Sequence, residues 1–334
     1  MVSKALTARV IFQRHPLVYI RHFKWYDVVM NRTDLHALDE LNRRLMVIRD
    51  RVRGVGLRHH TGFYLYGRPG TSKTYTVTKT LDEFGISYFY HKGHLTPMGT
   101  FELLEQQHER IIVLDDVAKI LSDETALQIL LAALGHQPDR NAPRIVRYRR
   151  QGKDATIYFT GGIILISNLE FRPTPLLDAL KSRVHYLGYD PSDEQLAALM
   201  RQIASKGWQS LLSPAECADV TEWVISESSR LAIRLDIRVL VDKAFPDYFQ
   251  HRLGQTEAHW KDLITATLEA RVIELRHTGA SLSRQDTKAA EHRLIESIVA
   301  DFPDPKSRVE AWKSRTAKSE RAFYRRLREI GVLT

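Results

Sequence analysis

The segment that most constrains the fold is a glycine-rich stretch, Gly67–Thr74 (GRPGTSKT), between a short apolar run and a helical pattern. The apolar run Phe63–Tyr66 is typical of a buried strand. A loop of this composition between a strand and a helix binds phosphate through backbone amides and the helix N-terminus. We expect Lys73 to reach the β- and γ-phosphates of a nucleotide, and the hydroxyl of Thr74 to ligate Mg2+.

The loop departs from the usual pattern at one position. Ser72 stands where the pattern has its second glycine, so we expect its backbone to adopt a conformation that normally favours glycine. The nucleotide is expected to contact the whole loop, that is Gly67, Arg68, Pro69, Gly70, Thr71, Ser72, Lys73 and Thr74.

A second motif, Ile111–Asp116 (IIVLDD), is an apolar strand that ends in two carboxylates. In a parallel sheet the ends of such strands lie at the same edge as the phosphate loop. Asp115 is expected to hold Mg2+, directly or through water, and Asp116 to polarise the attacking water. Because the side chain of Asp116 is shorter than that of Glu, it leaves two alternatives, slow hydrolysis or a shifted water position.

Short apolar runs alternate with helical patterns up to Tyr189, which predicts an α/β fold with a parallel sheet covered by helices on both faces. Beyond Tyr189 the patterns are helical, and Ser192 with Gln195 and Ser213 with Glu216 fit capping boxes. A helix is also expected before the sheet, with Leu35 to Ile48 at helical spacing. The predicted strands are Phe63–Tyr66, Tyr88–Tyr90, Ile111–Leu114 and Ile163–Ser167.

These motifs resemble those of the AAA+ ATPases, and the resemblance extends along the chain. Asn168, after the strand Ile163–Ser167, is similar to sensor 1 of that family, which orients water against the γ-phosphate. The segment Leu177–Val184 is similar to the one that delivers an arginine finger into a neighbouring subunit, and Arg183 is the candidate. Arg238 resembles sensor 2 on the helical lid.

The resemblance covers roughly residues 35–250 and is strongest to the small ATPases of phages, plasmids and transposons. It implies ATP and Mg2+ as cofactors. It also implies a homo-oligomer, a hexameric ring or a filament, because a trans-acting arginine needs a neighbour. The expected units are an N-terminal segment and helix (1–58), an AAA+ α/β nucleotide-binding domain (59–189), a helical lid (190–278) and a basic helix-turn-helix-like domain (284–334).

Composition narrows the classes of protein further. The only cysteine, Cys217, excludes disulfides within the chain and argues against a cysteine-based zinc site. No apolar run approaches the length of a membrane span, so we expect a cytoplasmic protein without a membrane partner. The net charge of +9 favours polyanionic partners.

One candidate contact for DNA is a predicted hairpin, Arg144–Thr160, which reads as two alternating strands around a Gln-Gly-Lys-Asp turn. In some DNA-translocating relatives a hairpin at this point projects into the pore. Arg147, Arg149 and Lys153 would suit a phosphate backbone. The alternative is a solvated hairpin that binds nothing.

The basic tail is the other candidate, with 12 Lys or Arg and 8 Asp or Glu from Arg284 onward. A capping box at Ser307 predicts one helix, and Ser319 predicts the start of another. Arg321, Arg325 and Arg328 then share one face, as in the recognition helix of a helix-turn-helix. The alternative is an amphipathic helix packed on the lid with ordinary exposed arginines.

Two functions follow from these patterns. The first is an AAA+ ATPase that hydrolyses ATP in a ring or filament and engages DNA, in replication, transposition or a related function of mobile elements. The second is an ATP-driven protein remodeller or assembly switch, whose basic tail binds an acidic protein partner.

Overall fold

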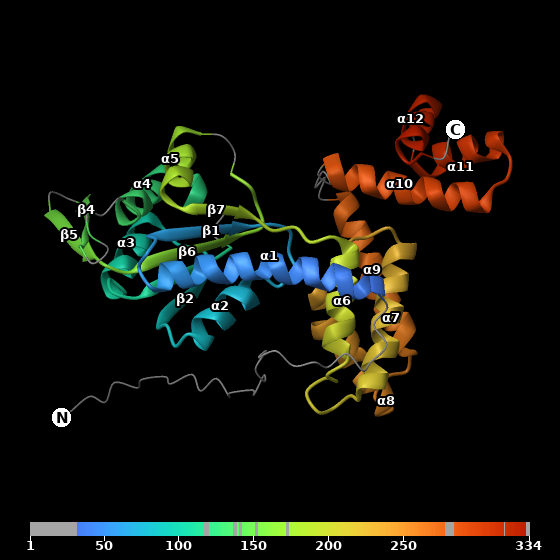
Figure 1. Cartoon of the computed structure of the whole chain (residues 1–334), viewed down its shortest axis with the longest axis horizontal. Helices are drawn as coiled ribbons and strands as arrows, with labels where there is room; N and C mark the ends of the chain where they lie inside the picture. The colour runs from blue at the N-terminus through green and yellow to red at the C-terminus, as the bar shows by residue number, and fades with distance from the viewer. Residues whose placement is uncertain are drawn as a thin grey trace.

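The structure is a computed structural model, and it describes residues 32–116, 120–135, 139, 142–150, 153–171, 174–277, 284–316 and 318–331. At its centre lies a parallel sheet of five strands in the order β2-β3-β6-β1-β7 (Figure 1). Only β7 was not predicted, because it is short and half-buried. The strands are β1 (Gly62–Tyr66), β2 (Tyr88–Lys92), β3 (Ile111–Asp115), β6 (Gly162–Ser167) and β7 (His185–Gly188).

Helices cover both faces of this sheet, as predicted. Successive strand residues point to opposite faces, so Phe63 and Leu65 enter one core and Tyr64 enters the other. The first core is closed by α1 (Arg32–Gly56) and α2 (Lys73–Glu83). The second is closed by α3 (Pro97–Gln106), α4 (Glu124–Ala133), which follows the short helix η1 (Ile120–Ser122), and α5 (Pro175–Arg183).

A bundle of helices follows the sheet along the chain and has a hydrophobic core of its own. Both predicted capping boxes are present, at Ser192 with Gln195 and at Ser213 with Glu216. The N-terminal part of α1 packs on this bundle through Ala37 and Leu38. The bundle consists of α6 (Asp193–Ala204), α7 (Pro214–Arg230), the π-helical turn η2 (Val239–Ala244), α8 (Phe245–Arg252) and α9 (Trp260–His277).

The C-terminal part of the chain forms three helices, α10 (Arg284–Asp301), α11 (Pro305–Thr316) and α12 (Glu320–Glu329). The predicted capping box at Ser307 is wrong. Because proline is favoured in the first turn of a helix, α11 begins at Pro305, and the carboxylate of Asp304 accepts a bond from the Ser307 amide at 2.9 Å. The core consists of Ile295, Ile298, Val309, Trp312, Phe323 and Leu327.

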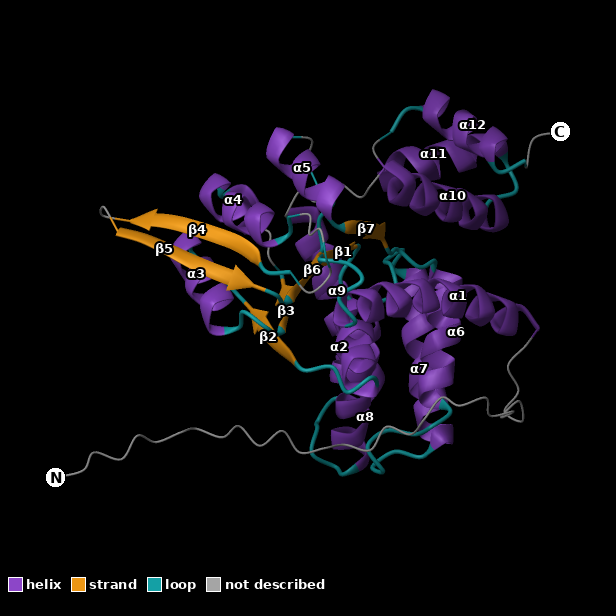
Figure 2. Cartoon of the chain, turned by 60° about the vertical axis from the view of Figure 1, so that its left-hand side comes forward, coloured by secondary structure: helices purple, strands orange, loops and turns teal. Residues whose placement is uncertain are grey.

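The predicted hairpin is confirmed. Its strands, β4 (Arg144–Arg150) and β5 (Lys153–Phe159), pair antiparallel, and the side chains of Val146 and Phe159 lie in the core beside α3 and α4. The hairpin and the bundle α6–α9 lie at opposite ends of the α/β unit (Figures 1 and 2). The predicted linker Gly279–Ser283 lies outside the described residues.

None of the helices that the structure describes is both long enough and apolar enough to span a bilayer.

We expect Trp312→Ala to unfold the C-terminal unit alone. Trp312 is fully buried in a core whose described members all belong to the three C-terminal helices, and emptying such a site costs about 3–5 kcal/mol. Hydrogen exchange of the full chain should show lost amide protection in α10–α12 and unchanged protection in the sheet. Ser314→Ala, at an exposed position of α11, is the control and should change neither; loss of protection in the sheet as well would contradict separate cores.

Candidate functional site

The glycine-rich loop has the backbone conformation that its composition predicts. Ser72 has φ 65° and ψ 15°, in the left-handed region, which confirms the expectation for this position and costs an L-residue about 1 kcal/mol. Gly67 and Gly70 also have positive φ, 155° and 73°. A Cβ on Gly67 would lie 1.9 Å from the carbonyl oxygen of Tyr189, so no larger residue fits there.

Four polar residues meet at the carboxyl edge of the sheet. Lys73 and Thr74 follow β1, Asp115 ends β3, and Asn168 follows β6, which lies between the other two strands. The Thr74 hydroxyl donates to Asp115 Oδ2 at 2.9 Å. Lys73 Nζ donates to Asn168 Oδ1 at 3.3 Å. Three separate segments of the chain are thus joined by side-chain hydrogen bonds.

The ammonium group of Lys73 lies inside the loop. Its Nζ donates to the carbonyl oxygens of Gly67 at 2.7 Å and Arg68 at 2.6 Å, and the residue is only 6% exposed. Burial, followed by the charge of Arg238, lowers the pKa of Lys73 to about 8. Arg238, the predicted sensor arginine, follows Ile237, whose amide donates to the carbonyl oxygen of Gly70 in the loop, and its side chain is exposed.

The carboxylate of Asp115 is almost buried and accepts two hydrogen bonds at one oxygen. Besides Thr74, the hydroxyl of Tyr90 donates to Oδ2, at 2.7 Å. Burial and then this hydrogen bond raise the pKa of the Tyr90 phenol, so that it stays a donor. Carboxylate and hydroxyl oxygens are the ligands that Mg2+ prefers, and Asp115 with Thr74 therefore fits that ion.

The neighbouring Asp116 has an unusual backbone. Its φ is 62°, a left-handed conformation uncommon for residues other than glycine. Its amide donates to the carbonyl oxygen of Ile166 on β6 at 3.0 Å, which fixes the turn after β3. The side chain is exposed beside the buried Asp115.

Arg68 connects the loop to the start of the helical bundle. Its guanidinium donates to Asp190 Oδ1 at 2.8 Å and to Asp193 Oδ1 at 3.3 Å. It also donates to the carbonyl oxygens of Pro191 and Leu235, both at 3.0 Å. The side chain of this predicted nucleotide contact is thus engaged with the bundle, while its carbonyl group remains part of the loop.

A second contact joins the loop to the segment before η2. The amide of Ile237 donates to the carbonyl oxygen of Gly70 at 3.0 Å. A Cβ on Gly70 would lie 1.9 Å from Asp236 Oδ1, and Asp236 is itself held by Arg271 at 2.9 Å. The bundle and the loop therefore touch through backbone, next to Arg238.

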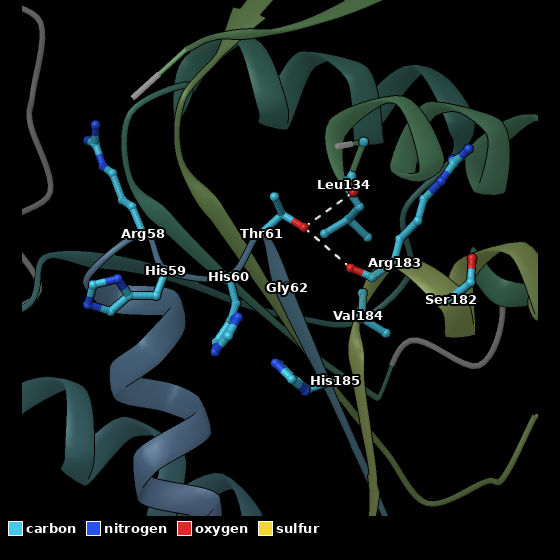
Figure 3. Close-up of a pocket in the computed structure, with 11 residues that line it drawn as sticks. Arg58, His59, His60, Thr61, Gly62, Leu134, Ser182, Arg183, Val184 and His185 are labelled. Atoms are coloured by element: carbon cyan, nitrogen blue, oxygen red, sulfur yellow. Dashed lines mark hydrogen bonds between the residues drawn. The ribbon is translucent and has the colours of Figure 1, made fainter. Parts of the chain in front are cut away.

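Arg183 lies at the opposite edge of the sheet, at the end of α5 and before β7. It lines a pocket of about 420 Å3 (Figure 3), and its Nη1 donates to the carbonyl oxygen of Leu131 at 2.8 Å. In this pocket the rings of His60 and His185 meet edge to face, 4.1 Å apart. Burial lowers the pKa of both histidines, and Arg51 contributes to the shift. The structure does not bring Arg183 to the loop of its own chain.

The candidate DNA contacts lie outside this site. Arg147 and Arg149 are exposed on β4, and Arg149 Nε lies 3.4 Å from Asp154 Oδ1; the side chain of Lys153 is outside the described residues. Arg321, Arg325 and Arg328 are exposed on α12, whereas Phe323 and Leu327 on its other side are buried.

Two contacts at the site have no signal in the sequence. Tyr90 belongs to an edge strand with unremarkable aromatic spacing, and only the pairing of β2 with β3 brings it to Asp115. The ion pairs of Arg68 span more than a hundred residues of sequence. Both depend on tertiary structure.

The sequence gives no match to protein-family models or to curated proteins. Among solved structures, the chain is similar to "Structure of Rhizobiales Trip13", at 12% identity, with 71% of this chain and 95% of that chain covered and a TM-score of 0.39. Because this TM-score is low, the fold is assigned from the observed strand order alone. The chain has an α/β fold with a five-stranded parallel sheet and flanking helices, which is compatible with the AAA+ fold.

Proposed function

We propose that this chain is an AAA+ ATPase that binds and hydrolyses ATP at the carboxyl edge of its sheet. The observation that carries the proposal is the meeting of Lys73, Thr74, Asp115 and Asn168, which lie at the ends of three strands or beyond them and are joined by hydrogen bonds. A glycine-rich turn without a function would not need the carboxylate of Asp115, from another strand, beside the hydroxyl of Thr74.

The loop suits a triphosphate. The side chain of Ser72, the residue before α2, makes no capping bond to the first turn, so this helix N-terminus is available to phosphate oxygens. Lys73 would exchange its bonds to the loop carbonyls for the β- and γ-phosphates. Thr74 and Asp115 would hold Mg2+, which supplies charge neutralisation on the phosphate oxygens.

Two side chains near the γ-phosphate position would act on water. Asp116 would accept a hydrogen bond from the attacking water and then its proton, and its exposure leaves the carboxylate free to meet solvent. Asn168 would orient the same water once ATP binding draws Lys73 away. Arg238 would approach the γ-phosphate from the bundle α6–α9, and this bundle would act as a lid.

We expect Lys73→Ala to abolish tight ATP binding, because it removes the charge at the centre of the loop. Calorimetric titration with a slowly hydrolysed ATP analogue measures this. Lys79→Ala, which removes a lysine from the same helix at a half-buried position, should bind like the parent. If Lys73→Ala binds the ATP analogue with the affinity of the parent, the loop is not the nucleotide-binding site.

The position of Arg183 supports catalysis between subunits. The five residues of β1 separate the edge near Arg183 from the loop, a span of about 16 Å at 3.3 Å per residue. Arg183 therefore serves as an arginine finger only for a neighbouring subunit, in a ring or filament. Such a finger contributes mainly to turnover rather than to ATP binding.

Mixing two inactive variants tests this arrangement. Arg183→Ala should bind ATP normally and hydrolyse it roughly 1000-fold more slowly, the smaller end of the effects known for arginine fingers. A mixture with Lys73→Ala should regain activity, since some interfaces then pair an intact loop with an intact arginine. If subunits exchange, as shown by fluorescent labels, and activity still does not return, Arg183 has no trans role.

DNA engagement is proposed for the C-terminal unit. α11 and α12 pack on each other through Trp312 and Phe323, whose ring centroids lie 5.9 Å apart, and Arg321, Arg325 and Arg328 of α12 face solvent. This fits a helix-turn-helix with α12 as the recognition helix. Together with the basic strand β4, it favours a DNA-engaging ATPase of replication, transposition or a related function.

Replacing Arg321, Arg325 and Arg328 with Gln should weaken duplex DNA binding and flatten the slope of log affinity against log salt by roughly 2 to 3. Affinity at several salt concentrations measures both. The control replaces Arg43 on α1, Lys206 in the turn after α6 and Lys243 on η2, all exposed, with Gln and gives the same net charge. If both variants lose affinity equally, or neither does, α12 is not the DNA contact, and an acidic protein partner becomes the better explanation of the tail.

A further inference from the structure

Tyr90 is the side chain outside the predicted site that contacts the metal-binding carboxylate. Its hydroxyl lies 2.7 Å from Asp115 Oδ2, closer than the Thr74 hydroxyl at 2.9 Å on the same oxygen. Two donors from different segments that converge on one oxygen leave the carboxylate a single orientation. The other oxygen, Oδ1, then remains as the acceptor for a cation or its water.

The register of the sheet explains why a tyrosine can make this contact. Tyr90 pairs with Val113 in the parallel ladder, and Asp115 lies two residues further along β3, on the same face. The offset is about 6.6 Å along the strand, which a tyrosine side chain bridges with its hydroxyl. A phenylalanine at this position would fill the same space without reaching the carboxylate.

The surroundings of the phenol belong to the nucleotide site. Tyr90 is 38% exposed, and its hydroxyl is bonded to Asp115. The charges of Asp115, Arg238 and Asp116 act on the pKa of its phenol. Its charged neighbours are therefore residues of the proposed site.

We propose that Tyr90 is a positioning residue for Mg2+, which fixes the Asp115 carboxylate in the orientation that receives the metal of the bound nucleotide. The proposal rests on the proposed function, since it takes Asp115 and Thr74 as the metal site. It assigns Tyr90 no direct contact with the reacting atoms. Partners that hydrogen-bond a ligating carboxylate typically contribute 10–100-fold in metal affinity or activity.

The test is the Mg2+ dependence of nucleotide binding in the full chain. Tyr90→Phe should need roughly 10-fold more Mg2+ for half-maximal binding of a fluorescent, slowly hydrolysed ATP analogue. In excess EDTA its nucleotide affinity should equal that of the parent, because the loop and Lys73 are intact. The affinity of the nucleotide complex for Mn2+, measured by electron paramagnetic resonance, should fall by the same factor.

Tyr88→Phe is the matched control. Tyr88 lies on the same strand and face, and burial and then Asp82, not Asp115, raise the pKa of its phenol. This variant loses a tyrosine hydroxyl near a different carboxylate without touching Asp115. Its Mg2+ dependence should equal that of the parent, which separates positioning of the metal from a general loss of stability.

Asp115→Asn distinguishes failure of this proposal from failure of the proposed function. If Asp115→Asn needs more Mg2+ and Tyr90→Phe does not, the positioning role of Tyr90 is overturned and the metal site stands. If neither variant changes the Mg2+ dependence, the metal site itself is wrong and the proposal falls with it. Equal shifts in Tyr88→Phe and Tyr90→Phe would also overturn the specific role of Tyr90.

Discussion

The candidate site depends on the parallel pairing of three strands, β1, β6 and β3, that come from distant parts of the chain. Asp115 pairs with Ile166 of β6, and Leu65 of β1 pairs with the same residue from the other side. A shift of β3 by one residue would turn the Asp115 carboxylate to the opposite face, toward α3 and α4. The register therefore brings the proposed magnesium ligands and the glycine-rich loop together, and the two hydrophobic cores hold that register through the apolar residues of these strands.

A network of charges then links this edge of the sheet to the helical bundle. Asp193 Oδ1 accepts from Arg68 at 3.3 Å, from Arg234 at 3.0 Å and from the amide of Leu235 at 3.2 Å. Arg68 and Arg234 share this mostly buried carboxylate and also that of Asp190, at 2.8 and 3.8 Å, so loss of Asp193 would leave two arginines on one half-exposed partner. A change in the conformation of the loop would therefore alter the contacts at the start of the bundle.

Much of this architecture is predictable from local sequence. The strands before Gly67 and before Asp116 are short apolar runs, and the capping boxes at Ser192 and Ser213 use short-range hydrogen bonds. The start of α11 was misplaced because Asp304 and Ser307 offer competing acceptors and Pro305 favours the earlier one. Contacts between segments were out of reach: the phenol of Tyr90 and the guanidinium of Arg68 find their partners only after the sheet and the bundle have assembled.

The long helix α1 has a consequence for motion between the two halves. It is 25 residues long, and its glycines, Gly54 and Gly56, lie at its end, so its interior resists bending. Its C-terminal part is buried against the sheet, while its N-terminal part carries Asp34, whose carboxylate lies 2.9 Å from Arg201 on α6. The same stiff helix therefore packs on the sheet at one end and holds α6 at the other. The bundle cannot move far from the sheet without breaking the contacts of α6 with α1, so α1 limits the distance between Arg238 and the glycine-rich loop.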